Sequence, residues 1–119
     1  MISSFGKVLK EQRNKHNDTL KTLSEKLEIS LPYLSAMEVG RKLVPMEIVQ
    51  KIKVLYCLSD KEYDEIYMAM LDSNNKVDIE LSKMNEAQRE VSMVFARKIE
   101  NADPELIEKL RKALSDDKD

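Results

Sequence analysis

Few residues of this 119-residue chain have the side chains that catalysis or metal binding requires. The single cysteine, Cys57, allows neither an internal disulfide nor a cysteine-based zinc site, and it is expected in the core. The single histidine, His16, is expected at a helix end as a favourable cation. Carboxylates gather at residues 60–65, but there they favour the dipole of a predicted helix. The pattern predicts no enzyme, no metal site, no cofactor and no small-molecule substrate.

Residues 19–40 indicate a different chemistry, contact with nucleic acid. Two short helices are predicted there with a tight joint at Glu28-Ile29, and the second helix has a largely uncharged outer face. Two cations, Arg41 and Lys42, follow directly. This pattern is typical of a helix-turn-helix, whose second helix enters the major groove while helix N-termini and flanking cations contact phosphate. The segment therefore predicts binding to double-stranded DNA.

The charge distribution agrees with a nucleic-acid-binding front half. Residues 1–58 hold ten Lys or Arg against six Asp or Glu, whereas residues 59–119 hold ten against sixteen. A net charge of −2 therefore divides into +4 and −6. A basic head with an acidic tail is typical of a DNA-binding segment joined to a segment with another task.

The elements that must position these residues are all expected to be helices. Only two glycines and three prolines are present, too few for the turns of an all-β domain. Apolar spacing and capping signals predict helices over residues 4–16, 19–27, 30–39, 45–57 and 59–72. Ser3 or Ser4, Thr19, Ser30 and Ser59 are the expected N-caps, with Glu62 completing a capping box. Gly40 is expected to supply the left-handed residue that ends the third helix.

The back half is expected to mediate association. Val77, Ile79 and Leu81 alternate with charged residues, which favours a short strand that would have to pair with a second copy or another protein. Two amphipathic helices follow, one from Asn85 through Phe95 to Ile99 and one from Pro104. We expect a DNA-binding domain at residues 1–73 and a dimerisation or partner-binding extension at 74–119. Val77, Ile79, Leu81 and Phe95 are the candidate dimerisation residues.

The front half also resembles the Cro and cI phage-repressor group, the xenobiotic-response-element type of helix-turn-helix. The resemblance spans Phe5 to about Met70 and is carried by the segments FGKVLKEQR at 5–13, TLKTLSEKL at 19–27 and ISLPYLSAMEVGRK at 29–42. The last segment is the most specific. The resemblance implies a five-helix lambda-repressor-like domain that binds DNA.

The resemblance also implies a role for individual positions. The residues expected to contact DNA are Thr19, Ser30, Leu31, Pro32, Tyr33, Ser35, Ala36, Arg41 and Lys42. Those expected to be structural are Arg13, Leu23, Ile29, Leu34, Met37, Glu38 and Gly40. Two positions depart from the usual pattern, because Leu20 replaces a common Gln and Glu28 replaces a common Gly. The groove-facing set offers hydrogen-bonding side chains at Tyr33 and Ser35, so direct readout of base edges is expected to be weak.

Two functions from different classes fit these features. One is a transcriptional repressor that binds a palindromic operator as a homodimer. The other is an antitoxin or phage-encoded interaction protein, whose acidic back half grips a basic protein while the front half regulates its own operon. With no signal peptide and no run of about 18 apolar residues, either would be cytoplasmic, in a prokaryote or during phage infection.

Overall fold

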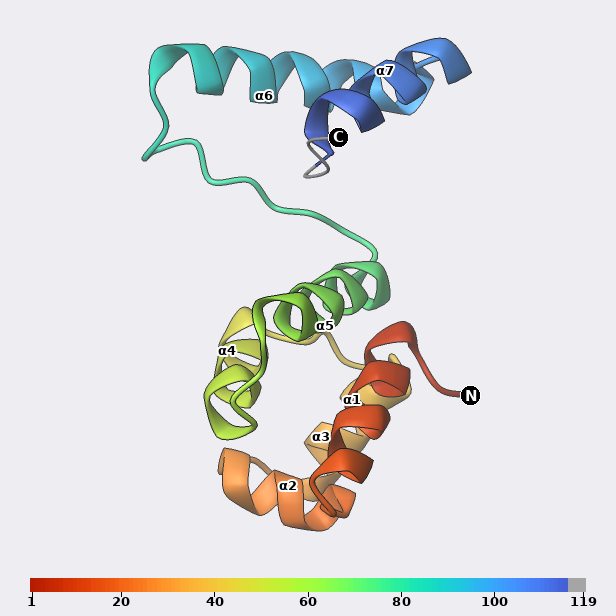
Figure 1. Cartoon of the computed structure of the whole chain (residues 1–119), viewed down its shortest axis with the longest axis vertical. Helices are drawn as coiled ribbons and strands as arrows, with labels where there is room; N and C mark the ends of the chain where they lie inside the picture. The colour runs from red at the N-terminus through yellow and green to blue at the C-terminus, as the bar shows by residue number, and fades with distance from the viewer. Residues whose placement is uncertain (116–119) are drawn as a thin grey trace. The chain divides into compact units, whose positions relative to one another are not determined.

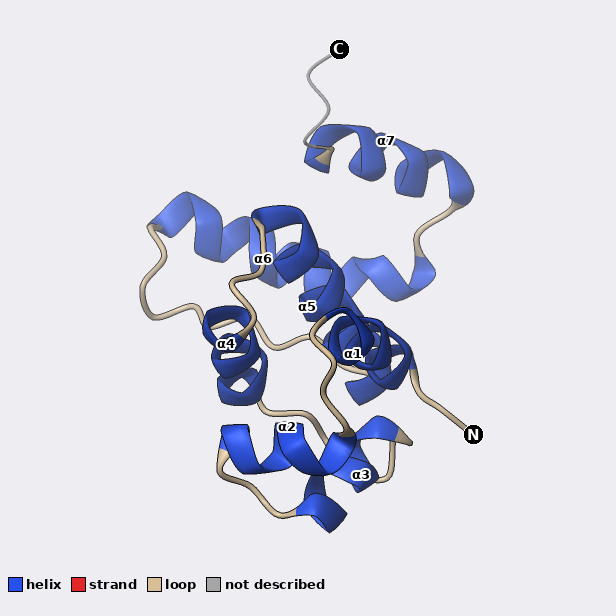
Figure 2. Ribbon diagram, turned by 60° about the horizontal axis from the view of Figure 1, so that its bottom comes forward, coloured by secondary structure: helices blue, strands red, loops and turns tan. Residues whose placement is uncertain are grey.

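The computed structural model describes residues 1–115, which form two compact units, each treated by itself (Figure 1). The first is Met1–Val77 and the second begins at Asp78. The domain boundary expected between residues 73 and 74 thus falls four residues before the observed division. Every regular element in residues 1–115 is a helix, and Figure 2 shows no strand there. The expected all-α class is confirmed.

Five α-helices build the first unit, as the sequence predicts. They are α1 (Ser4–Lys15), α2 (Leu20–Leu27), α3 (Leu31–Glu38), α4 (Met46–Leu55) and α5 (Asp60–Asn74). Hydroxyl caps start four of them, since Ser3, Thr19, Ser30 and Ser59 each accept a hydrogen bond from a backbone N–H of the first turn. Ser59 and Glu62 form the predicted capping box. These helix starts are local events, which is why sequence signals locate them closely.

Helix ends in the first unit repeat one geometry. After α1, α2, α3 and α4 a single residue has positive φ, and these residues are Asn17 (56°), Glu28 (60°), Gly40 (83°) and Cys57 (50°). In each case the next N–H bonds back to a carbonyl five residues earlier, as from Arg41 to Ala36 at 2.8 Å. This is the Schellman motif, which reverses the chain within two residues. Because three non-glycine residues adopt this conformation, the chain makes its tight joints with only two glycines.

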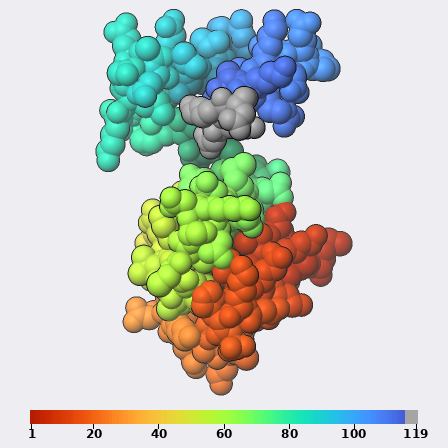
Figure 3. Space-filling model, viewed as in Figure 1, coloured from red at the N-terminus to blue at the C-terminus, as the bar shows by residue number. Residues whose placement is uncertain are grey.

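The core of the first unit is made by the inward faces of its five helices. Phe5, Leu9, Leu23, Leu34 and Met37 are fully buried, together with Val49, Ile52 and Ile66 from α4 and α5. On the face shown in Figure 3, α1 and α5 lie side by side, and they are a closely packed pair. The expectation of a buried Cys57 is wrong. As the left-handed residue after α4, it lies in a turn and its side chain is exposed.

Gly6 allows α1 to lie directly against the end of α3. It is buried inside α1, and a Cβ built on it would overlap the carbonyl oxygen of Glu38 and the side chain of Ile2. The backbone N–H and the hydroxyl of Ser3 both donate to that same carbonyl, at 3.0 and 2.8 Å. The first turn of α1 therefore satisfies a carbonyl that the end of α3 leaves unpaired.

A buried carboxylate ties the end of α1 to α2 and α4. Asp18 is 7% exposed, and it accepts a hydrogen bond from the Tyr56 hydroxyl at 2.7 Å and an ion-paired one from Lys26 at 2.9 Å. Burial alone would raise the pKa of the Asp18 carboxyl, but these two donors hold it below its ordinary value. The His16 ring stacks on Tyr56, with centroids 4.0 Å apart.

A second carboxylate, Glu62, connects α5 to α1. It accepts hydrogen bonds from the Ser59 N–H at 3.0 Å, from Gln12 at 3.2 Å and from Lys15 at 3.1 Å. The Ser59 bond, followed by those from Gln12 and Lys15, lowers the pKa of Glu62 to about 2 from an ordinary 4.5. The capping box at the start of α5 is thus also a tertiary contact.

The second unit contains α6 (Glu86–Lys98), a short 3-10 helix η1 (Ile99–Asn101) and α7 (Pro104–Leu114). Asn85 and Gln88 form the second capping box, and Asp103 caps α7 with Pro104 in its first turn. The short strand expected over Val77–Leu81 is not formed in the single chain. A strand needs a partner for its backbone N–H and C=O groups, and residues 1–115 contain none.

The substitution Gly6→Ala tests the close approach of α1 and α3. In an isolated helix this change is stabilising by about 0.5–1 kcal/mol. Here we expect a loss of about 1–3 kcal/mol, because the added methyl group must displace the Glu38 backbone. Urea unfolding followed by circular dichroism measures the difference. A gain in stability would show that the two helices can separate at little cost.

The substitution Glu28→Gly tests the left-handed joint between α2 and α3. We expect the free energy of unfolding to rise by about 1 kcal/mol, since glycine has no side chain to strain at positive φ. The matched control is Glu25→Gly in the interior of α2, which should lower stability by about 1 kcal/mol. Equal losses at both positions would contradict a strained Glu28.

The substitution Glu62→Gln tests the α5–α1 connection through pH. Because the folded pKa of Glu62 is about 2 and its ordinary value is 4.5, ionised Glu62 stabilises the fold above pH 4.5. This contribution is lost as the pH falls from 4.5 toward 2. We therefore expect the melting-temperature difference between wild type and the variant to be largest above pH 4.5 and to shrink below it. A difference that does not change with pH would exclude this role.

Candidate nucleic-acid interface

The helix pair α2–α3 lies at one end of the first unit, anchored by its inner face (Figures 1 and 2). Leu23 of α2 and Leu34 and Met37 of α3 are fully buried. Ile29 in the joint is only half-buried but packs against the same core. With these residues turned inward, the opposite side of α3 and both helix N-termini face solvent.

The residues expected to contact DNA divide by exposure. Thr19, Ser30, Leu31, Pro32, Arg41 and Lys42 are exposed. Tyr33, Ser35 and Ala36 are half-buried, and Tyr33 packs against the core. The accessible part of α3 is therefore its first turn, where Leu31 is 38% exposed. Tyr33 is more involved in packing than the sequence pattern suggests.

The N-termini of α2 and α3 remain electrostatically positive. Thr19 Oγ1 accepts from the Thr22 N–H at 3.0 Å, and Ser30 Oγ accepts from the Tyr33 N–H at 3.2 Å. Each hydroxyl satisfies one N–H, and other first-turn N–H groups have no partner within the helix. Neither first turn contains an acidic residue, whereas those of α4 and α5 do. The two helix ends are thus suited to receive phosphate oxygens.

Two cations, Arg41 and Lys42, follow α3 and are exposed to solvent. The Arg41 N–H and Gly40 close the Schellman turn, which fixes the path of the backbone just before the side chains of Arg41 and Lys42. Neither cation forms an ion pair within residues 1–115. Their charges are therefore available to an anion.

Arg13 and Glu38 form the most enclosed ion pair among the described residues. Their side chains are 12% and 16% exposed, and Arg13 Nη2 lies 3.2 Å from Glu38 Oε2. Arg13 Nη1 also donates to the Asp18 carbonyl at 3.3 Å. The guanidinium therefore joins the end of α1, the loop after it and the end of α3, which fits a structural role better than phosphate contact.

Several contacts that position the interface are not evident from the sequence pattern. Gly6, Gln12, Asp18 and Tyr56 all hold helices against α1 or α2. One signal was present, since a glycine inside a helix costs about 1 kcal/mol relative to alanine and usually has a packing reason. The polar contacts carry no such local signal.

The candidate dimerisation residues lie around and within the second unit. Val77 and Ile79 are 64% and 48% exposed, and Leu81 and Phe95 are half-buried. Among residues 1–115 no group of three or more His, Cys, Asp or Glu side chains is arranged to hold a metal ion. No helix in that part of the chain is long and apolar enough to span a membrane.

Comparison with protein families agrees with this geometry. Residues 9–53 match the family model described as Helix-turn-helix, a segment that contains α2, α3 and the two cations. No significant match was found among curated proteins or among solved structures. The matched segment has the buried inner faces, the tight joint and the exposed N-termini of that motif. The first unit of this chain thus carries a DNA-binding helix-turn-helix domain of the Cro/cI, or xenobiotic-response-element, type.

Proposed function

We propose that this transcription regulator is a repressor, which binds a palindromic operator as a homodimer and acts by occupancy in the cytoplasm of a prokaryotic or phage-infected cell. The observation that carries the proposal is the exposed end of α2–α3. Two helix N-termini without acidic residues and two exposed cations, Arg41 and Lys42, which have no ion-pair partner within residues 1–115, lie on a helix-turn-helix whose inner face is anchored by fully buried side chains.

Phosphate contact supplies most of the proposed binding energy. Thr19 and the first-turn N–H groups of α2 would contact one phosphate, and Arg41 and Lys42 others. Binding should therefore weaken steeply with salt, because each neutralised phosphate releases counterions.

Base readout in the proposed complex comes from the first turn of α3. Leu31, Pro32 and Ala36 can touch thymine methyl groups, and Ser35 can donate to a base edge. Since Tyr33 packs against the core, its ring serves to support this turn, with contact limited to its exposed edge. This set discriminates less than bidentate pairs would, so operator shape is expected to contribute to specificity.

A second function, binding of another protein by an autoregulatory antitoxin, has one observation in its favour. The described residues of the second unit include none that is buried, so its apolar side chains are open to a partner. A second copy of this chain could cover the same apolar side chains. The charges of α6 and α7, considered below, bear on which of the two partners is favoured.

The double substitution Arg41→Ala/Lys42→Ala tests the proposed interface. Fluorescence anisotropy with promoter fragments, including the chain's own upstream region, should show at least tenfold weaker binding. The slope of log K against log salt should fall in magnitude by about 2, as two phosphate contacts are lost. The matched control Lys61→Ala/Lys83→Ala removes two exposed cations elsewhere and should leave the slope nearly unchanged.

Two outcomes would contradict the proposal. One is equal and weak binding of wild-type protein to every fragment, which would remove sequence specificity. The other is an equal loss in the test and control variants, which would mean that net charge, not this surface, binds DNA.

A further inference from the structure

The second unit exposes apolar surface that a stable helical unit normally buries. Neither α6 nor α7 has a buried residue, and Val91, Val94 and Leu106 are 67%, 40% and 39% exposed. Helices of 13 and 11 residues are marginal in water without tertiary packing. We therefore expect the apolar side chains of α6 and α7 to be covered by another protein surface.

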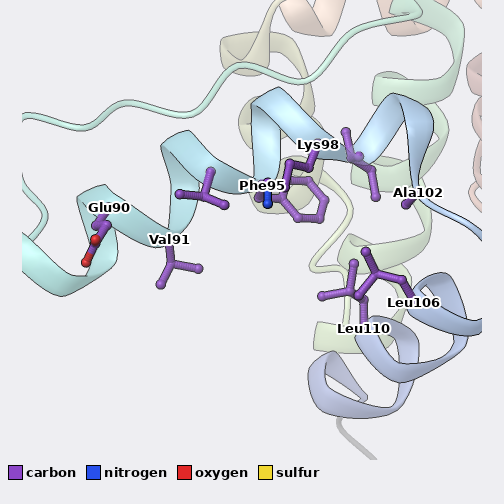
Figure 4. Close-up of a pocket in the computed structure, with 9 residues that line it drawn as sticks. Glu90, Val91, Phe95, Lys98, Ala102, Leu106 and Leu110 are labelled. Carbon is purple, nitrogen blue, oxygen red and sulfur yellow. The ribbon is translucent and has the colours of Figure 1, made fainter.

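The exposed apolar side chains line a groove between α6 and α7. It has a volume of about 430 Å³, and Figure 4 shows Leu106 and Leu110 extending from α7 toward the ring of Phe95 on α6. Val91 and Val94 continue the lining along α6. Two charged residues of α6, Glu90 and Lys98, complete the wall, and neither has an ion-pair partner within residues 1–115.

The charges of α6 and α7 favour a second copy of these helices over a basic partner. Residues 86–114 hold six acidic and six basic side chains, so the acidic excess of the back half lies outside the two helices. Within each helix the first turn is acidic and the last turn is basic. Two such helices are complementary when they run antiparallel, whereas a basic protein would meet as many like charges as opposite ones.

The α6 stripe is symmetric about one residue. Val94 lies midway between Glu90 and Lys98, which are four residues before and four after it. When two copies of α6 pack antiparallel about a two-fold axis at Val94, residue 90 of each copy faces residue 98 of the other. The same operation places the two valines against each other at the axis. This register therefore buries the apolar side chains around Val94 and pairs Glu90 and Lys98 of each copy with Lys98 and Glu90 of the other.

From these observations we propose that the groove is closed by α6 of a second copy of this chain, antiparallel about Val94, with Glu90 of each copy paired to Lys98 of the other. The proposal deepens the proposed function, on which it rests for the use of the dimer at an operator. It assigns the interface to α6 and α7 in place of a strand at Val77–Leu81. Phe95, Leu106 and Leu110 become the apolar core of the assembled unit.

Charge reversal on the full chain tests this register. Glu90→Lys and Lys98→Glu each replace two attractive pairs with two repulsive ones, and sedimentation equilibrium should show dimer dissociation constants at least tenfold higher than wild type. The double variant Glu90→Lys/Lys98→Glu restores both pairs and should return to within about threefold of wild type. Lys83→Glu, an equal charge change outside the helices, is the control and should dimerise normally.

Three results would overturn the proposal: a wild-type chain that stays monomeric at 100 micromolar by the same measurement, single reversals without effect, or a double variant as weak as the singles. Circular dichroism of each variant separates loss of helix from loss of dimer. These measurements contain no DNA, so their failure leaves the Arg41/Lys42 result intact. Conversely, loss of DNA binding in the Arg41→Ala/Lys42→Ala variant leaves dimerisation unchanged if both assignments hold.

Discussion

The position of α3 depends on the close approach of α1 to its C-terminal end. Helix α3 has only eight residues, too few to be stable or fixed in direction by itself. Gly6 removes the side chain that would keep α1 away, and Ser3 donates twice to the Glu38 carbonyl. The Arg13–Glu38 ion pair closes the other side of the same contact. Since Arg13 is engaged there, the proposed phosphate contacts are assigned to other residues.

The other helices of the first unit are also held in place by close contacts at their ends. Schellman turns end the first four helices abruptly, and the connections between consecutive helices have only three to seven residues, so the helices pack without long loops. Asp18 and Glu62 then join consecutive and distant helices through hydrogen-bonded charges. The result is a small domain whose exposed α2–α3 end combines backbone N–H groups held by the fold with the solvent-exposed cations Arg41 and Lys42, a combination suited to binding a regular polyanion.

The second unit solves a different problem, because two short helices cannot make a core alone. The balanced, antiparallel-complementary charges of α6 and α7 and the apolar groove between them suit the proposed association, which would then be part of the folding of this unit. In the proposed dimer, pairing two DNA-binding heads would multiply the phosphate contacts at one operator. The two proposals thus assign association and DNA recognition to separate surfaces of one chain.

The sequence by itself determined the helices, their caps and the family. Hydroxyl caps, both capping boxes, Pro104 and Gly40 act within one turn, so their residues identify them without knowledge of the fold. Only the tertiary structure decided what those helices touch. It placed Cys57 at the surface, drew Tyr33 into packing, made Gly6 a helix contact and left residues 77–81 without a strand. The Gly6 contact depends on Glu38, 32 positions away in the chain, and the strand depends on a partner strand, and no local pattern encodes such partners.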